Sequence, residues 1–387
     1  MRTLIKNAKV VTAERVIDGC CAYTDGVIDY VGEQEVPADE IIDAEGGYLV
    51  PGFIDLHCHG GNNLEFMDAG VEGLGKFADF HKAHGTTTLF PTTLAAADCE
   101  IIEALENFKK YIADHPNSTM AGVYLEGPWL NPKQCGAQDT SYMKNPDAEY
   151  LKTLKEKYPF IAKVGAAPEL PGGAEFGEMG KKLGIVMSPA HTDGDFTDME
   201  EALKHGYTIM THLYSGMKGV ERRNAYRYAG AIEAGLYFDS YYVEVIADGK
   251  HLPLELLKYI YKIKGPDRIC MITDAIRASG LASGATTKIG SMARGLEVIV
   301  EDDVAKLPDR QAFAGSTATA DRLYRTMAKA IGRGPEQLVA LSKMSSLSPA
   351  RVMGLTDRGE IKEGKIADLV ILSPELEVVK VITEKQN

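Results

Sequence analysis

The stretch GFIDLHCHG, residues 52–60, indicates how this 387-residue chain folds. It is a short, continuous apolar run that ends in polar residues, which is typical of a strand buried on both faces of a parallel sheet. Further runs of this kind follow along the chain. They are TTTLFPTTL (86–94), AGVYLEGP (121–128), AKVGAAPE (162–169), IVMSPAHTD (185–193), TIMTHLYSG (208–216), VEVIADGKH (243–251) and ICMITDA (269–275).

Amphipathic segments lie between most of these runs, for example GLGKFADFHKAHG (73–85) and DMEEALKHGY (198–207). Strands that alternate with helices form parallel sheets, and eight such units in succession predict a closed (β/α)8 TIM barrel. We place this barrel at residues 51–354. A doubly wound open sheet of similar units is the alternative.

Both ends of the chain have a different pattern. Residues 1–50 contain short segments rich in β-branched residues between turn residues, and this pattern returns near the end of the chain in GEIKEGKIADLVIL (359–372). We therefore expect an α/β protein in which residues 1–50 plus 355–387 form a small β-sandwich domain. A β-rich segment near 286–313 is expected to be an excursion after the eighth strand.

The composition excludes several classes of function. The formal net charge is −13, whereas nucleic-acid binding requires clustered lysine and arginine. No stretch approaches the roughly 18 consecutive apolar residues of a membrane span, and the N-terminal residues lack the pattern of a signal peptide. The six cysteines show no CxxC spacing, which favours reduced thiols and a cytoplasmic location.

Side chains that can bind metal gather at the ends of the predicted strands. The carboxyl ends of barrel strands face the active site. His57 and His59 flank one residue, so both side chains point to the same face of an extended strand. Imidazole and carboxylate groups suit Zn²⁺ or Fe²⁺. The candidate ligands are His57, His59, Glu126, His191 and His212.

Asp274 lies near the end of the eighth run, and its expected role is in proton transfer rather than in metal binding. Cleavage of an amide by metal-activated water also requires a proton for the leaving nitrogen. A carboxylate beside the metal can accept the proton of the water and pass it on. We therefore predict that Asp274 is the catalytic acid/base, and a helix N-cap is the alternative.

Several motifs resemble those of a known family. They are PGFIDLHCHG (51–60), LEGPWLNP (125–132), SPAHT (188–192), THLYSGM (211–217), ADGKH (247–251), ITDA (272–275) and GEIKEGKIADLVIL (359–372). Together they are similar to the N-acetylglucosamine-6-phosphate deacetylases of the amidohydrolase superfamily, and the resemblance runs from about residue 3 to residue 383. LEGPWLNP with ADGKH is quite specific, whereas the HxH after PGFID is shared by the whole superfamily.

The resemblance implies roles for the candidate ligands. Glu126, His191 and His212 would hold the main metal ion. His57 and His59 match the pair used by members with a second ion, and Glu126 could then bridge the two ions. The resemblance thus implies one or two divalent ions per chain, Zn²⁺ or Fe²⁺.

It also implies roles in substrate binding. Asp274 matches the catalytic acid/base, and His251 matches the residue that contacts the sugar phosphate. The family commonly has Asn-Ala, which helps to hold the phosphate, where this chain has Ser215 and Gly216. The exchange keeps the backbone donors but loses the Asn side chain.

A second departure lies in CGAQ (135–138), where Ala137 precedes Gln138. Many members have a histidine near the substrate carbonyl at the position of Gln138. Glutamine can donate a hydrogen bond but cannot be a cation, so a second metal ion could polarise the carbonyl more strongly here. The small-residue turn AGST (314–317) resembles a family loop whose backbone lies close to the sugar.

The third departure concerns the arginine that binds phosphate, which lies in the loop after the sixth strand. Counting forward from His212 selects Arg223, whereas counting back from GAI selects Asn224. Arg222 and Arg227 are near enough to compete, so the arginine of the phosphate site stays open among these residues.

The residues and the resemblance together favour one function. We expect hydrolytic deacetylation of N-acetylglucosamine 6-phosphate in amino sugar metabolism, by an enzyme that the resemblance implies to be a homodimer. The alternatives are a deacetylase of N-acetylgalactosamine 6-phosphate and an amidohydrolase for another N-acyl or cyclic amide substrate. A catalytically dead scaffold is a third possibility, and it would have damaged metal or acid positions.

Overall fold

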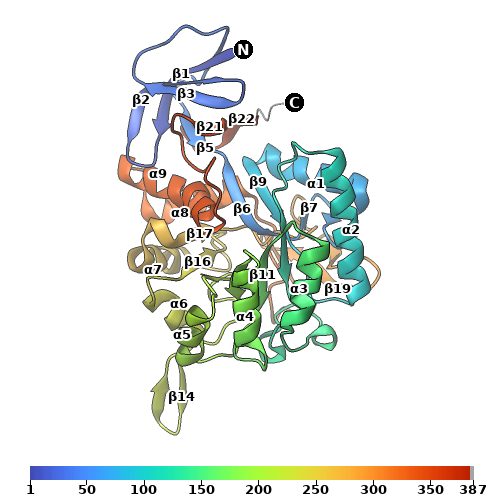
Figure 1. Ribbon diagram of the computed structural model, residues 1–387. Coiled ribbons are helices and arrows are strands. Elements are labelled where there is room, and N and C mark those ends of the chain that lie inside the picture. Colours follow the sequence, from blue (N-terminus) through green and yellow to red (C-terminus); the bar gives the residue numbers. More distant parts are fainter. Residues whose placement is uncertain (384–387) are drawn as a thin grey trace.

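Eight short parallel strands form the centre of the computed structural model, which describes residues 1–383 (Figure 1). They are β6 (Phe53–Cys58), β9 (Thr86–Pro91), β10 (Val123–Glu126), β11 (Ile161–Ala166), β12 (Val186–Pro189), β13 (Ile209–Met210), β16 (Tyr242–Val245) and β17 (Ile269–Met271). Backbone pairing joins them in three groups, β6–β9, β10–β11–β12 and β13–β16–β17.

Isolated parallel bridges connect these three groups. Thr92 pairs with Tyr124, Met187 with Tyr207, and Ala275 with Cys58. The pairing therefore runs once around a circle and returns to β6, and it brings the ends of all eight strands to one rim. The expected mixed α/β class is confirmed.

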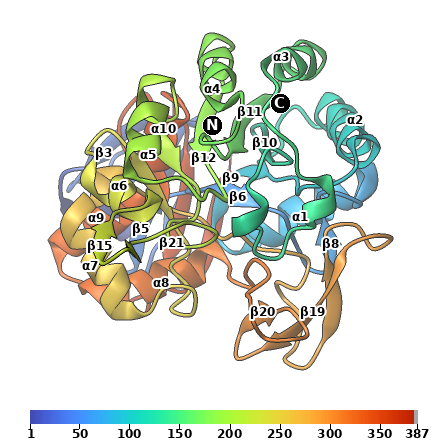
Figure 2. The same ribbon diagram turned by 90° about the horizontal axis from the view of Figure 1, so that it is seen from below.

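Helices follow most of these strands and lie outside them (Figure 2). They are α1 (Gly70–Ala83), α2 (Asp98–Asp114), α3 (Ala148–Lys157), α4 (Gly173–Lys182), α5 (Phe196–Lys204), α6 (Ala231–Tyr237), α7 (Leu254–Lys264), α8 (Ala320–Ile331), α9 (Pro335–Ser342) and α10 (Ser348–Val352). Shorter helical turns are η1 (Pro132–Gln134), η2 (Thr140–Tyr142), η3 (Pro266–Arg268) and η4 (Lys343–Leu347). In the part of the chain that the structure describes, no helix combines the length and apolarity needed to cross a membrane.

The strands lack polar and apolar alternation because both of their faces are covered. Every residue of β6 and β9 is buried. Leu74 and Phe77 of α1 and Phe108 of α2 belong to the main hydrophobic core that surrounds the strands. Burial on both faces explains why the sequence shows continuous apolar runs rather than a period of two.

Both chain ends contribute strands to one seven-stranded sheet beside the ring (Figure 1). Its strands are β1 (Arg2–Val11), β2 (Val16–Thr24), β3 (Val27–Gly32), β4 (Glu40–Asp43), β5 (Tyr48–Pro51), β21 (Asp368–Leu372) and β22 (Val378–Thr383). β21 pairs antiparallel with β5, which joins the two ends. The boundaries of the small domain and its sandwich form stay predictions, and residues 384–387 of its second segment lie outside the described residues.

Three small antiparallel units extend from the connections. β7 (Gly60–Gly61) pairs with β8 (Leu64–Glu65) beside the ring. β18 (Thr286–Ile289), β19 (Leu296–Glu301) and β20 (Val304–Lys306) form the excursion expected near 286–313. β14 (Glu221–Arg223) and β15 (Tyr226–Tyr228) form a hairpin that stands away from the body (Figure 1).

Candidate metal centre

Six buried side chains converge at the rim where the parallel strands end. Glu126 is the last residue of β10, and His57 lies within β6 one residue before its end. The other four follow strand ends by one to three residues. They are His59 after β6, His191 after β12, His212 after β13 and Asp274 after β17.

The carboxylate of Glu126 lies at the centre of this cluster. Its Oε1 is 2.8 Å from Nε2 of His212, 3.3 Å from Nε2 of His191 and 3.6 Å from Nε2 of His57. Its Oε2 is 3.4 Å from Nε2 of His59. Four imidazoles therefore point a nitrogen atom toward one carboxylate.

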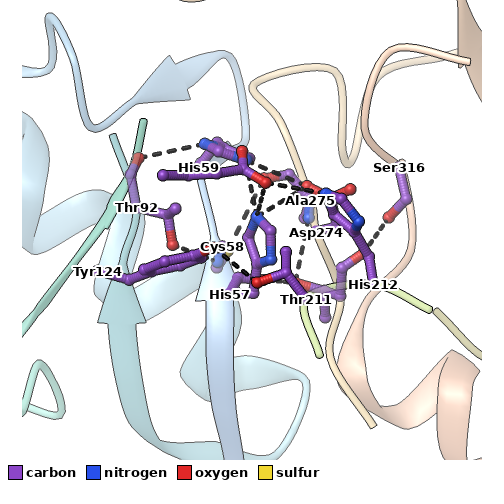
Figure 3. A network of polar contacts seen from close by, with 12 residues as sticks. His57, Cys58, His59, Thr92, Tyr124, Thr211, His212, Asp274, Ala275 and Ser316 are labelled. Atoms are coloured by element: carbon purple, nitrogen blue, oxygen red, sulfur yellow. Dashed lines mark hydrogen bonds and ion pairs between the residues drawn. The ribbon is translucent and has the colours of Figure 1, made fainter. Parts of the chain in front are cut away.

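Asp274 closes the other side of the cluster (Figure 3). Its Oδ1 lies 3.1 Å from Nε2 of His59 and 3.4 Å from Nε2 of His57. The two histidine Nε2 atoms are themselves 3.0 Å apart. Asp274 thus faces the same space as the paired histidines, where a carboxylate can contact both a metal ion and a water molecule.

The donor atoms fit divalent metal ions. Three overlapping sets of side chains have ligand atoms within 4.8 Å of one another. Nitrogen and carboxylate oxygen ligands in sets of this kind suit Zn²⁺ and Fe²⁺. The sets are Glu126 with His191 and His212, His57 with His59 and Glu126, and His57 with His212 and Asp274.

The opposing charges of the cluster shift the pKa values of its members. Burial lowers the pKa of His57 and of His59, but Glu126 and Asp274 outweigh burial and raise these values to about 9 and about 10. Burial raises the pKa of Asp274, but the imidazoles of His57 and His59 outweigh it and lower that pKa to about 2. These shifts favour protonated imidazoles beside ionised carboxylates when no metal ion is bound.

Unusual backbone conformations aim several of these side chains. His191, His212 and Asp274 have φ angles of 42°, 27° and 49°, a region that residues other than glycine seldom adopt. Two glycines make room for them. A Cβ on Gly216 would lie 2.6 Å from Nδ1 of His191, and one on Gly315 would lie 2.8 Å from the carbonyl oxygen of Asp274.

Neighbouring acceptors orient the rings. Nδ1 of His191 lies 2.7 Å from the carbonyl oxygen of Gln134, and Nδ1 of His59 lies 3.2 Å from that of Thr92. A backbone carbonyl can only accept, so each Nδ1 carries a hydrogen, and each Nε2 faces the cluster and offers its lone pair to a metal ion once it is deprotonated. The sequence offered no signal for these backbone partners.

A pocket opens above the cluster and contains most of the residues expected to bind substrate. Ala137, Gln138, Ser215, Gly216 and His251 all line it, together with every cluster residue except His57. The Gln138 side chain is fixed at both ends, because its Oε1 accepts from Ala95 N at 2.7 Å and its Nε2 donates to Glu126 Oε2 at 2.9 Å.

His251 stands in the wall of this pocket. Its Nδ1 lies 2.8 Å from Oδ2 of Asp248, which leaves Nε2 for other contacts. The ring also packs against Phe313, with the ring centroids 4.8 Å apart. The role of Asp248 was missed, although its position three residues before His251 was a signal within ADGKH.

The arginines lie elsewhere, so the structure of a single chain differs here from the sequence-based expectation. Arg223 ends β14 and donates to both carboxylate oxygens of Asp195, at 2.9 and 2.7 Å. Arg227 is exposed on β15. Neither of these residues, nor Arg222, lines the pocket in the described residues. The reason is that the loop folds into the projecting hairpin and carries all three arginines away from the ring.

Comparison of the sequence with known protein families shows which family the chain belongs to. The model of the amidohydrolase family matches residues 48–384. The chain therefore belongs to the amidohydrolase family, and it is a hydrolytic enzyme.

Its relatives narrow the class further. The N-acetylglucosamine-6-phosphate deacetylase of Bacillus subtilis (strain 168) is 32% identical, over 98% of this chain and 95% of its own length. A solved structure of the N-acetyl-D-glucosamine-6-phosphate deacetylase from Mycobacterium smegmatis is also similar; it is a mutant in complex with N-acetyl-D-glucosamine-6-phosphate. Its TM-score is 0.90 at 27% sequence identity, and the match covers 99% of this chain and 98% of that one. An N-acetylgalactosamine-6-phosphate deacetylase of Escherichia coli O157:H7 is 29% identical, over 94% of this chain and 92% of its own length.

The overlapping donor sets predict two ions per chain. Protein dialysed against excess Zn²⁺ should contain about two equivalents by elemental analysis, and His57→Asn should contain about one, because Glu126, His191 and His212 stay intact. His205→Asn, which changes a histidine outside the cluster, is the control and should keep both ions. Saturation of the wild type at one ion would contradict the prediction.

The raised pKa values predict that metal binding displaces protons. The raised pKa values of His57 and His59 favour protonated imidazoles in the metal-free cluster at neutral pH, and Zn²⁺ binds only the deprotonated rings. Binding should therefore release protons, and the apparent affinity should rise with pH until about pH 9 to 10. Calorimetric titration in buffers of different ionisation enthalpy counts the protons. A value near zero at neutral pH would show that these rings are not protonated before the metal binds.

Proposed function

We propose that this enzyme hydrolyses the acetamide of N-acetylglucosamine 6-phosphate and releases glucosamine 6-phosphate and acetate. The observation that carries the proposal is the intact cluster of five metal-binding side chains with Asp274, at the floor of a pocket that also holds His251. The relatives named as deacetylases of this substrate support it. Acetate release by the purified, Zn²⁺-loaded protein is the direct test.

The architecture supports this site. We infer that the ring of eight parallel strands is a (β/α)8 barrel at residues 51–354, with a small β-sandwich domain from 1–50 plus 355–387. The circular pairing of the strands supports the barrel. Active sites of such barrels lie at the carboxyl ends of the strands, which is where the cluster lies.

The residues divide the chemistry among them. Zn²⁺ or Fe²⁺ held by Glu126, His191 and His212, and a second ion at His57 and His59, would lower the pKa of a water molecule and polarise the acetyl carbonyl. Asp274 then accepts the proton of the attacking water and delivers it to the sugar nitrogen as the C–N bond breaks.

Gln138 and Ala137 contact the acyl end of the substrate. The amide Nε2 of Gln138 is aimed at the cluster because Ala95 N fixes its Oε1. A donor in this position can stabilise the oxygen of the acetyl carbonyl as negative charge develops on it. The donor is neutral, so its contribution does not depend on its own protonation.

The phosphate end of the substrate binds near His251. Asp248 accepts from Nδ1 of His251, which leaves Nε2 as the ring nitrogen that can face a phosphate oxygen. We assign Gly216 N–H as the backbone donor, because Ser215 N–H already donates to the His212 carbonyl at 2.9 Å. Arg223 or Arg227 would act here only if the hairpin of this chain moves or another chain brings its own hairpin to the pocket.

Assembly and location follow from the same proposal. We propose a homodimer, because the projecting hairpin exposes Tyr226 and Tyr228, and aromatic side chains are enriched at protein interfaces. The six cysteines form no disulfide bond, which supports a reducing, cytoplasmic location.

A deacetylase of N-acetylgalactosamine 6-phosphate is the second candidate. The relative from Escherichia coli O157:H7 carries that name, and Ser215 with Gly216 departs from the common Asn-Ala of the glucosamine enzymes. Parallel assays on both sugar phosphates decide between the two. A higher kcat/KM for the galactosamine substrate would replace the first proposal with the second.

The acid/base role of Asp274 predicts a specific loss. Asp274→Asn keeps the size of the side chain but removes the proton carrier, so kcat should fall by roughly 10²–10⁴. Metal content must be measured in the same sample, because Asp274 faces the metal-binding histidines. A variant that keeps its metal and more than about a tenth of its activity would refute the assignment.

The phosphate pocket predicts a change in preference. A charge-assisted hydrogen bond contributes roughly 1.5–3 kcal/mol, which corresponds to a factor of about 10–150. His251→Ala should lower the ratio of kcat/KM for N-acetylglucosamine 6-phosphate over N-acetylglucosamine by that factor. Arg223→Ala and Arg227→Ala are measured in the same assay. A similar fall in this ratio for either variant would show that an arginine of the hairpin contacts the phosphate. Equal use of both sugars by the wild type would mean that no phosphate pocket exists.

A further inference from the structure

A buried ion pair spans the interior of the strand ring next to the metal centre. Lys163 lies on β11 and Glu244 lies on β16, and both side chains are fully buried. Nζ of Lys163 donates to Oε1 of Glu244. The ammonium also lies over the ring of Tyr124, 3.6 Å from its centroid.

The second oxygen of Glu244 faces the metal centre. Oε2 lies 3.4 Å from Nδ1 of His57 and accepts from the backbone N–H of His212 at 3.3 Å. One carboxylate thus contacts a residue of each proposed ion site. The contact to His57 is through the side chain, whereas the contact to His212 is through the backbone.

His57 differs from the other histidines of the cluster in this contact. His59 and His191 direct Nδ1 to backbone carbonyls, and Nδ1 of His212 has no hydrogen-bond partner within residues 1–383. Among the described residues, His57 is the one cluster histidine whose Nδ1 faces a carboxylate. A carboxylate in this position holds the hydrogen on Nδ1, turns the lone pair of Nε2 toward the metal and makes that nitrogen more basic.

Stability alone does not account for the pair. A buried ion pair is often no more stabilising than apolar side chains of the same size, because both charges lose their hydration. The pair is not isolated in the ring, because Tyr124, over whose ring the ammonium lies, also hydrogen-bonds through its hydroxyl to Thr211 at 2.9 Å. What the ion pair does achieve is to hold one carboxylate oxygen of Glu244 against Nδ1 of His57.

We propose that Glu244, held by Lys163, is the positioning residue that makes His57 a ligand of the second ion. The proposal rests on the two-ion site of the proposed function. It assigns to Lys163 the task of neutralising and orienting Glu244, so that one oxygen is always available to Nδ1 of His57.

Two double variants test the proposal. Lys163→Met with Glu244→Gln removes both charges but keeps an oxygen that can accept from His57. Lys163→Met with Glu244→Met removes that oxygen as well and keeps a side chain of similar length. The two proteins differ in the side-chain amide, whose oxygen can accept from Nδ1 of His57 and from the His212 N–H, and neither leaves a buried charge without a partner.

Titration with Co²⁺ against a competing chelator, followed by the visible absorption of the bound ion, measures each affinity. The wild type and the Gln variant should bind two ions. The Met variant should keep the tighter ion and bind the second about 10- to 100-fold more weakly. A purely structural role would lower the melting temperature of both metal-free variants without separating their second-ion affinities.

Equal second-ion affinity in the two variants would overturn the proposal and leave the two-ion site intact. A wild type that binds a single ion would overturn the two-ion site and the proposal with it. If the Met variant does not fold, nitrogen NMR of the metal-loaded wild type decides. A hydrogen on Nδ1 of His57 is the expected result, and a hydrogen on Nε2 would contradict it.

Discussion

The buried carboxylate of Glu126 is the constraint on which the rest of the site depends. It lies within 3.6 Å of a nitrogen atom on each of four imidazoles, and it is removed from solvent. Burying a carboxylate without a partner costs several kcal/mol, so the ring must supply positive charge at this point. Protons can supply it, and a divalent ion supplies it more completely. The low pKa of Asp274 and the high pKa values of His57 and His59 follow from the same requirement.

The backbone around Glu126 is arranged to meet this constraint. His191, His212 and Asp274 adopt positive φ angles where their strands end. Such conformations cost of order 1–3 kcal/mol each, and they persist where the surroundings hold them. The absence of a side chain at Gly216 and Gly315 removes the atoms that would collide with them. The strained backbone at these three residues thus lowers the free energy of unfolding, but it points their side chains toward the cluster around Glu126.

The sequence predicted the parts of the site that follow directly from strand ends. His57, Glu126 and Asp274 each stand in or just after an apolar run, and parallel strands bring their carboxyl ends to one rim. Glu244 and Lys163 are charged residues inside buried runs, which was a signal, but their pairing across the ring requires the strand order. Ring closure depends on contacts between β6 and the segment after β17, which are distant in sequence: Cys58 bridges to Ala275, and Asp274 N–H donates to the His57 carbonyl at 2.8 Å.

Anomalous diffraction from crystals of the Zn²⁺-loaded enzyme tests the central claim most directly. The account predicts two zinc peaks on either side of the Glu126 carboxylate, each about 2.0–2.2 Å from its nitrogen and oxygen ligands. One peak should contact His191 and His212, and the other should contact His57 and His59. Zinc bound elsewhere, with the cluster still held together by protons alone, would contradict the account.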